Sequence, residues 1–229
     1  MKNTKALVLI LCGVLLVTAT VLGTLAYLIS QDTVVNTFTV GDVSITLDET
    51  KVTPDGKPVG DLDGDGSPDR TNEGNDYHLI PGQTYIKDPT VTVKSGSEES
   101  YVRVLVTINK LAELDAIFAP TGADLLSIFN GYDDTKWDYV GKTEADNTIT
   151  YEFRYAETVN AVDAAEDIVL SPLFTAITLP GEMTGAQLKT LYTDPDDRLS
   201  ITVTAHAIQK SGFTTADAAW TAFEAQVAA

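Results

Sequence analysis

The chain has few thiols and few imidazoles, and it is short of positive charge. One cysteine and two histidines occur in 229 residues, and 15 basic side chains stand against 33 acidic ones. The scarcity of cysteine excludes a disulfide framework, so the fold must depend on its core, on bound ions or on neighbouring molecules. The formal charge of -18 argues against nucleic acid and anionic membrane surfaces as partners.

Motifs that carry catalysis are also missing. His78 and His206 stand far apart, and neither belongs to a His-Glu-x-x-His pair that could hold zinc and supply a base. The chain has no Gly-x-Ser-x-Gly elbow and no glycine-rich phosphate loop. His206 lies on the outward face of a predicted strand, and we interpret it as a surface histidine. The sequence therefore predicts that the protein is not an enzyme.

What is present begins with an export segment. Lys2 and Lys5 precede an apolar run over residues 6–26 that contains no charged residue. A short positive end, an apolar middle and small residues at the exit are typical of a secretory signal peptide, here residues 1–26. Cleavage is predicted between Ala26 and Tyr27. The alternative is an uncleaved anchor, because the run approaches the ~20 residues that span a bilayer.

Cleavage would change the composition of the exported domain, residues 27–229. The only cysteine, Cys12, would leave with the signal, so the exported domain would contain no thiol. Lys2 and Lys5 would leave too, and no acid would, so the remainder would be more acidic still. Contact with the membrane is expected only before cleavage, and the predicted location is extracellular.

The pattern of the exported domain predicts an all-β fold, a β-sandwich with a few short helices in its connections. Val102, Val104 and Val106 recur at every second position and share one face, which indicates a strand over 101–108 with the valine face in the core, and 199–208 behaves likewise. Further strands are predicted over 33–40, 43–47, 77–85, 90–93, 137–140, 148–155 and 173–179, and helices over 111–118, 123–129 and 184–192.

A helix is predicted over residues 214–228, at the end of the chain. Thr214 and Asp217 form a loose capping box at its start. Trp220, Phe223 and Val227 recur at helical spacing, and we expect this stripe to pack on the sandwich.

Residues 49–76 form an insertion rich in glycine, aspartate and proline, and we expect a long loop there. Part of it matches nine places of a calcium loop, with acids at places one, three, five and nine and glycine at place six. The five predicted calcium ligands are Asp61, Asp63, Asp65, Ser67 and Asp69.

The twelfth place of that loop departs from the pattern. Asn72 stands where a bidentate glutamate is expected, and Glu73 comes one place late. A weak calcium site is therefore the prediction, and an acidic solvated loop without metal is the alternative.

Several segments, in order, resemble the TasA/camelysin family of exported bacterial proteins. The segments are Gly23-Thr-Leu-Ala-Tyr27, Asn36-Thr-Phe-Thr-Val-Gly41, Ile80-Pro-Gly-Gln-Thr-Tyr85, Lys87-Asp-Pro-Thr-Val-Thr-Val93, Tyr101-Val-Arg-Val, Ala205-His-Ala-Ile-Gln209, Gly212-Phe and Ala219-Trp220. The resemblance implies a jelly-roll-like sandwich, processing by a SipW-type signal peptidase, and assembly into extracellular fibres of the biofilm matrix.

The resemblance also implies how subunits would join. In relatives, the segment freed by signal cleavage can complete the sheet of the next subunit, and here that segment is residues 27–40. A strand donated to another chain gives main-chain hydrogen bonds for affinity and side-chain pockets for register. A head-to-tail contact that does not close generates a filament of identical copies.

Three alternatives stay open at this point. Residues 27–40 can be an ordinary edge or leader segment. The protein can be a monomeric, calcium-dependent adhesion or binding module of the cell surface. Camelysin-type relatives have been described as metallopeptidases, although the missing zinc motif disfavours that activity here.

Overall fold

Strands dominate the computed structural model of the protein, which describes residues 29–33, 36–39, 43–62, 64, 66–194 and 197–227. The strands form sheets of six, four, three and two members, and each pairing among the described residues is antiparallel. The predicted all-β fold with a few short helices is confirmed. The jelly-roll connectivity that the resemblance implies stays a prediction.

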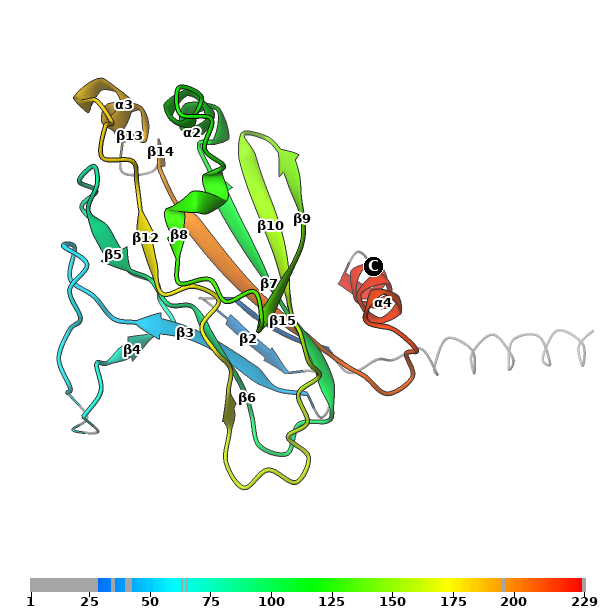
Figure 1. The fold of residues 1–229 in the computed structure, drawn as a ribbon. Coiled ribbons are helices and arrows are strands. Elements are labelled where there is room, and N and C mark those ends of the chain that lie inside the picture. Colours follow the sequence, from blue (N-terminus) through cyan, green and yellow to red (C-terminus); the bar gives the residue numbers. More distant parts are fainter. Residues whose placement is uncertain are drawn as a thin grey trace, which may run out of the picture.

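The six-stranded sheet is the largest sheet of the described structure (Figure 1). Its two long central strands, β15 and β7, pair in register from Ile201↔Ile108 to Gln209↔Ser100. Its members in spatial order are β2 (Asn36–Thr39), β1 (Ile29–Thr33), β15 (Ile201–Gln209), β7 (Ser100–Asn109), β10 (Thr148–Tyr155) and β9 (Trp137–Ala145).

The smaller sheets lie on one side of the six-stranded sheet (Figure 1). The four-stranded sheet runs β11 (Ile168–Val169), β6 (Thr90–Val93), β3 (Ile45–Thr50) and β4 (Arg70–Thr71). The three-stranded sheet runs β5 (Thr84–Ile86), β12 (Ala176–Thr178) and β8 (Phe129–Asn130), and β13 (Tyr192–Asp194) pairs with β14 (Asp197–Arg198).

One apolar core lies between the six-stranded sheet and the four-stranded sheet. Ile45 and Leu47 of β3 belong to the same buried cluster as Val104 of β7 and Val203 of β15. Trp137, at the start of β9, is fully buried and donates from Nε1 to the Ser171 carbonyl at 3.0 Å. Two sheets facing across a shared core make the sandwich that the alternating pattern predicts.

The helices are short and lie at the ends of the sandwich or on its outer side. They are α2 (Leu111–Phe118), the 3-10 helix η1 (Leu125–Ile128), α3 (Gly185–Thr190) and α4 (Ala216–Val227). α3 begins with a reciprocal capping box between Thr184 and Gln187. Among the described residues, no helix is both long enough and apolar enough to cross a membrane.

Several predicted boundaries were wrong. The strand expected over 33–40 is part of an antiparallel pair, β1 and β2, in which Thr33 pairs with Asn36. Of the strand expected over 77–85, only its end survives as β5. The helix expected over 123–129 shrinks to the single turn η1, where Asp124 accepts a hydrogen bond from the Leu126 N–H at 2.9 Å.

The insertion is also more ordered at its base than the sequence indicates. β3 continues to Thr50, and β4 pairs beside it through Glu49↔Thr71 and Thr50↔Arg70. The predicted start of the loop at residue 49 was therefore wrong by two residues, and the insertion leaves and returns through paired strands.

α4 differs from its prediction in its cap and its last turn. The helix begins at Ala216, and Thr215 rather than Thr214 caps it, accepting from the Ala218 N–H at 3.2 Å. Trp220 and Phe223 are buried on the sheet, as expected, but Val227 is 56% exposed. Residue 228, at the predicted end of the helix, lies outside the described residues.

Candidate functional site

The segment that follows the predicted cleavage site lies along the edge of the six-stranded sheet. β1 pairs with β15 over five residues, from Ile29↔Ile208 to Thr33↔Thr204, and β2 folds back on β1. β1 and β2, which we call the N-terminal hairpin, are thus the two outermost strands at that edge of the sheet (Figure 1). Residues 1–28, 34–35 and 40–42, which include Ala26 and Tyr27, lie outside the described residues.

β15 is the strand that the N-terminal hairpin covers. Val203, Ala205 and Ala207 of β15 point into the sandwich core, and β7 lies on the other side of the strand. β1 pairs with β15 over residues 204–208. Removing β1 would therefore leave the main-chain donors and acceptors on that side of β15 without their partner strand. Such an edge is a template for another strand.

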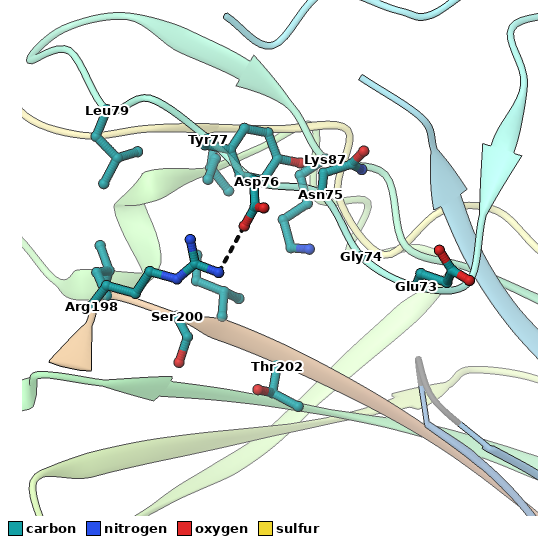
Figure 2. Close-up of a pocket in the computed structure, with 13 residues that line it drawn as sticks. Glu73, Gly74, Asn75, Asp76, Tyr77, Leu79, Lys87, Arg198, Ser200 and Thr202 are labelled. Carbon is teal, nitrogen blue, oxygen red and sulfur yellow. Dashed lines mark ion pairs between the residues drawn. The ribbon is translucent and has the colours of Figure 1, made fainter. Parts of the chain in front are cut away.

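A groove borders the first residues of β15, beyond the part paired with β1. It consists of two adjoining clefts of about 280 and 520 Å³, both lined by Asp76, Tyr77, Leu79, Arg198 and Leu199. Asp76 Oδ1 and Arg198 Nη2 form an ion pair at 2.8 Å across the groove (Figure 2). Both side chains are well exposed, so this pair is easily opened.

Three of the five predicted calcium ligands can be described. Asp61 Oδ2 accepts from the Gly66 N–H at 3.0 Å, and Asp69 Oδ1 accepts from the Leu62 N–H at 3.0 Å, so both carboxylates turn into the same loop. Gly66 has φ +86°, the positive value that a glycine at the sixth place of such a loop supplies. Asp63 and Asp65 lie outside the described residues.

The oxygen chemistry of this loop suits a hard cation, and these are the residues that could hold one. Ser67 and Asp61 are exposed, and Asp69 is half-buried. The described part of the chain contains no group of three or more histidine, cysteine, aspartate or glutamate side chains placed to hold a metal ion.

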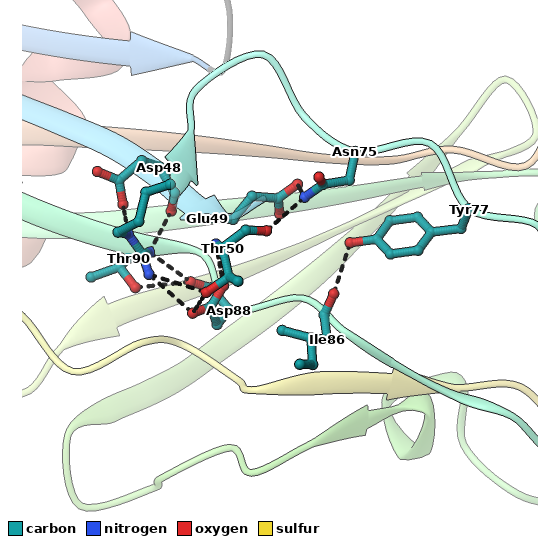
Figure 3. Close-up of polar contacts among 9 residues, drawn as sticks. Asp48, Glu49, Thr50, Asn75, Tyr77, Ile86, Asp88 and Thr90 are labelled. Atoms are coloured by element: carbon teal, nitrogen blue, oxygen red, sulfur yellow. Dashed lines mark hydrogen bonds and ion pairs between the residues drawn. The ribbon is translucent and has the colours of Figure 1, made fainter. Parts of the chain in front are cut away.

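The base of the insertion carries a polar cluster that the sequence analysis did not predict. Arg70 bridges Asp48 at 2.5 Å and Asp88 at 3.1 Å, and Asp88 accepts from both the N–H and the hydroxyl of Thr50 (Figure 3). Beside them, Glu49 is only 3% exposed. These contacts tie the insertion to β3.

The burial of Glu49 could have been predicted from the sequence. In β3 the buried face is Ile45, Leu47 and Glu49, so the period-2 rule that predicts the core also places this acid inside. A charged residue in that position requires a buried partner. The sequence does not show which distant residue supplies the partner, and the structure identifies Lys87.

The surface position predicted for His206 was wrong. The residue does lie on the face of β15 away from the core, but α4 covers that face and leaves it 5% exposed. His206 stacks on Phe223, and its Nδ1 accepts from Arg103 Nε at 3.1 Å. Desolvation by burial, and then the charge of Arg103, lowers the pKa of His206 to about 3. His78 is exposed.

Comparison of the chain with family models, with curated proteins and with solved structures finds no match in any of the three.

Proposed function

We propose that this chain is an exported structural protein whose copies link head to tail into extracellular fibres by exchanging the N-terminal hairpin. The observation that carries the proposal is the pairing of β1 with β15 at a sheet edge. The predicted SipW-type cleavage after Ala26 would free this hairpin from its membrane tether. Each copy would then both donate a hairpin and offer a β15 edge to the next copy, which is an open, heterologous contact.

Main-chain geometry supports the exchange. Pairing between β1 and β15 is a backbone ladder, so the β15 edge of a neighbour offers the same hydrogen bonds as the β15 edge of the same chain. The groove described above lies beside residues 198–202, at the start of β15. A hairpin that leaves its own sheet therefore finds an equivalent site on the next copy.

A disulfide lock tests the exchange. Thr33 and Thr204 are register partners, so Thr33→Cys/Thr204→Cys in a chain starting at Tyr27 introduces the only two cysteines of that chain. We expect the oxidised protein to stay monomeric by size exclusion and electron microscopy, and the reduced protein to form filaments. The matched control is Thr33→Ser/Thr204→Ser, which should form filaments under both conditions.

Filaments from the oxidised variant as readily as from the reduced one would exclude hairpin exchange. A second comparison uses a chain starting at Val43, which keeps all of β3 and removes the hairpin. If that chain and the chain from Tyr27 both remain monomers at high concentration, the protein is better explained as a monomeric binding module.

We include in the proposal a weakly bound calcium ion, with Asp61, Asp63, Asp65, Ser67 and Asp69 as its ligands. The loop closure between Asp69 and the Leu62 N–H supports it, because it brings the two ends of the acidic stretch together. We expect calcium to raise the melting temperature and EDTA to reverse the rise. Asp63→Asn/Asp65→Asn should abolish the response, and no response in the unaltered chain would remove calcium from the proposal.

A further inference from the structure

A lysine, a glutamate and an asparagine meet at the base of the insertion. Lys87 Nζ lies 2.6 Å from Glu49 Oε2, and Asn75 Nδ2 donates to Glu49 Oε1 at 2.9 Å. One carboxylate thus stands between an amine and a side-chain amide. Lys87 is 5% exposed and Glu49 3%, so the pair is almost fully withdrawn from water.

Tyr77 borders the triad of Lys87, Glu49 and Asn75, and it lines the same cleft as Lys87 and Asn75. Tyr77 and Tyr85 meet edge to face at 5.6 Å between ring centroids, and the Tyr77 hydroxyl donates to the Ile86 carbonyl at 2.9 Å (Figure 3). Burial, and then the charge of Glu49, raises the pKa of Tyr77. The Lys87 amine and the Glu49 carboxylate are in direct contact there, so a proton can move between them without passing through solvent.

The side-chain amide of Asn75 is fixed by three hydrogen bonds. Its Oδ1 accepts from the Val52 N–H at 2.9 Å, and its Nδ2 donates to the Thr50 carbonyl at 2.9 Å as well as to Glu49. The Val52 N–H faces the oxygen on which negative charge develops during addition to an amide. Glu49 faces the nitrogen that must leave, where a carboxylic acid can deliver its proton.

We propose that Lys87 and Asn75 become joined by an intramolecular amide bond, with Glu49 as the catalytic proton carrier. Lys87 Nζ, after giving a proton to Glu49, adds to Asn75 Cγ. The Cγ–Nδ2 bond then breaks as Glu49 protonates the leaving nitrogen. The remaining proton of the attacking nitrogen passes through Glu49 to the released ammonia, so the products are one amide, one ammonium ion and the original carboxylate.

The product has a way out. Asn75 and Lys87 both line the 280 Å³ cleft at the start of β15, and Figure 2 shows their side chains at its wall. Ammonium can leave through this cleft into solvent, and its dilution makes the reverse reaction slow. The bond would fasten the end of the insertion to the residue that follows β5, in a domain that has no thiol for a disulfide. It does not depend on assembly between copies.

Mass spectrometry of the purified chain tests the proposal directly. We expect the intact mass to fall below the mass that the sequence predicts, from the N-terminus found, by one ammonia molecule. Trypsin does not cleave after an acylated lysine, so Lys87 should be skipped. The deficit should then map to a single peptide, residues 71–94, that contains both partners.

Matched variants separate this bond from other losses of ammonia. Lys87→Arg and Glu49→Gln should restore the full mass, whereas Lys94→Arg, which alters a lysine paired with Asp167 on the surface, should keep the deficit. A folded wild-type chain with the full mass and normal cleavage after Lys87 overturns the proposal. So does a deficit that persists in Lys87→Arg, which would be a succinimide at Asn75.

Discussion

The two faces of the six-stranded sheet are buried by different chemistry. Toward the sandwich, β7, β10 and β15 present mainly apolar and aromatic side chains, such as Val104, Tyr151 and Ala205. Toward α4, the same strands present Arg103 and His206 beneath a small apolar cluster. On this sheet, the sandwich face depends mainly on packing, and the α4 face also depends on the charges of Arg103 and Glu224. Stability on the α4 face should therefore respond to pH and to single charges.

The largest loss of stability is expected from a substitution on the sandwich face. Trp137→Ala should lower the free energy of unfolding by about 4 kcal/mol, because it empties a fully buried site and leaves the Ser171 carbonyl without its donor. Phe223→Ala, under α4, should cost only about 2 kcal/mol, because the apolar cluster to which Phe223 belongs is small. Urea unfolding measures both, and equal losses would contradict the distinction.

The next effect is a pH dependence confined to the α4 face. The pKa of His206 is about 3 in the folded state, below the ordinary value of 6.5, so below pH 6.5 the unfolded state binds more protons. Stability should fall as the pH falls, by about 2 kcal/mol between pH 6.5 and 5. His206→Gln should lose this part of the slope in unfolding curves measured across that range. An unchanged slope would show that His206 does not cause it.

What could be predicted from the sequence was the face that each strand buries. Val102, Val104 and Val106 recur at every second position, and the structure places them in the core as expected. The period of two says which side chains share a face, but not what covers that face. His206 was assigned to the surface for this reason, since α4 arrives from a distant part of the chain.

Pairings between distant segments could not be predicted in the same way. The short strands β4 and β8 have no alternation long enough to detect, and they exist because β3 and β12 are beside them. Likewise, the alternation of β3 places Glu49 on the buried face. Its partners Lys87 and Asn75 could not be predicted, because they come from segments that only the fold brings together.

A smaller effect is expected from Arg103. Its guanidinium lies 4.5 Å from the Trp220 ring centroid and 4.9 Å from that of Phe223, and it pairs with Glu224. Arg103→Met should cost about 1 kcal/mol, because Glu224 is 62% exposed and can be hydrated instead. The pKa of His206 should rise in this variant, since the charge of Arg103 lowers it. An NMR titration that finds no rise would contradict the assignment.

The smallest effect is expected at the rim of α4. Arg154 Nη1 pairs with Asp217 at 2.5 Å, but the Asp217 side chain is 86% exposed. Asp217→Asn should change the unfolding free energy by about 0.5 kcal/mol at most, and high salt should erase the difference. A larger loss in urea unfolding would mean that surface charge, rather than the buried cluster, holds α4.

The five-residue ladder between β1 and β15 has a consequence for when copies could join. Under the proposed exchange, the same bonds would form within one chain or between two, so an attached hairpin would compete with one supplied by a neighbour. A short tether presents its own hairpin at an effective concentration on the order of millimolar. Dilute protein should therefore remain closed on itself, and crowding many newly trimmed copies at one place should favour linked chains.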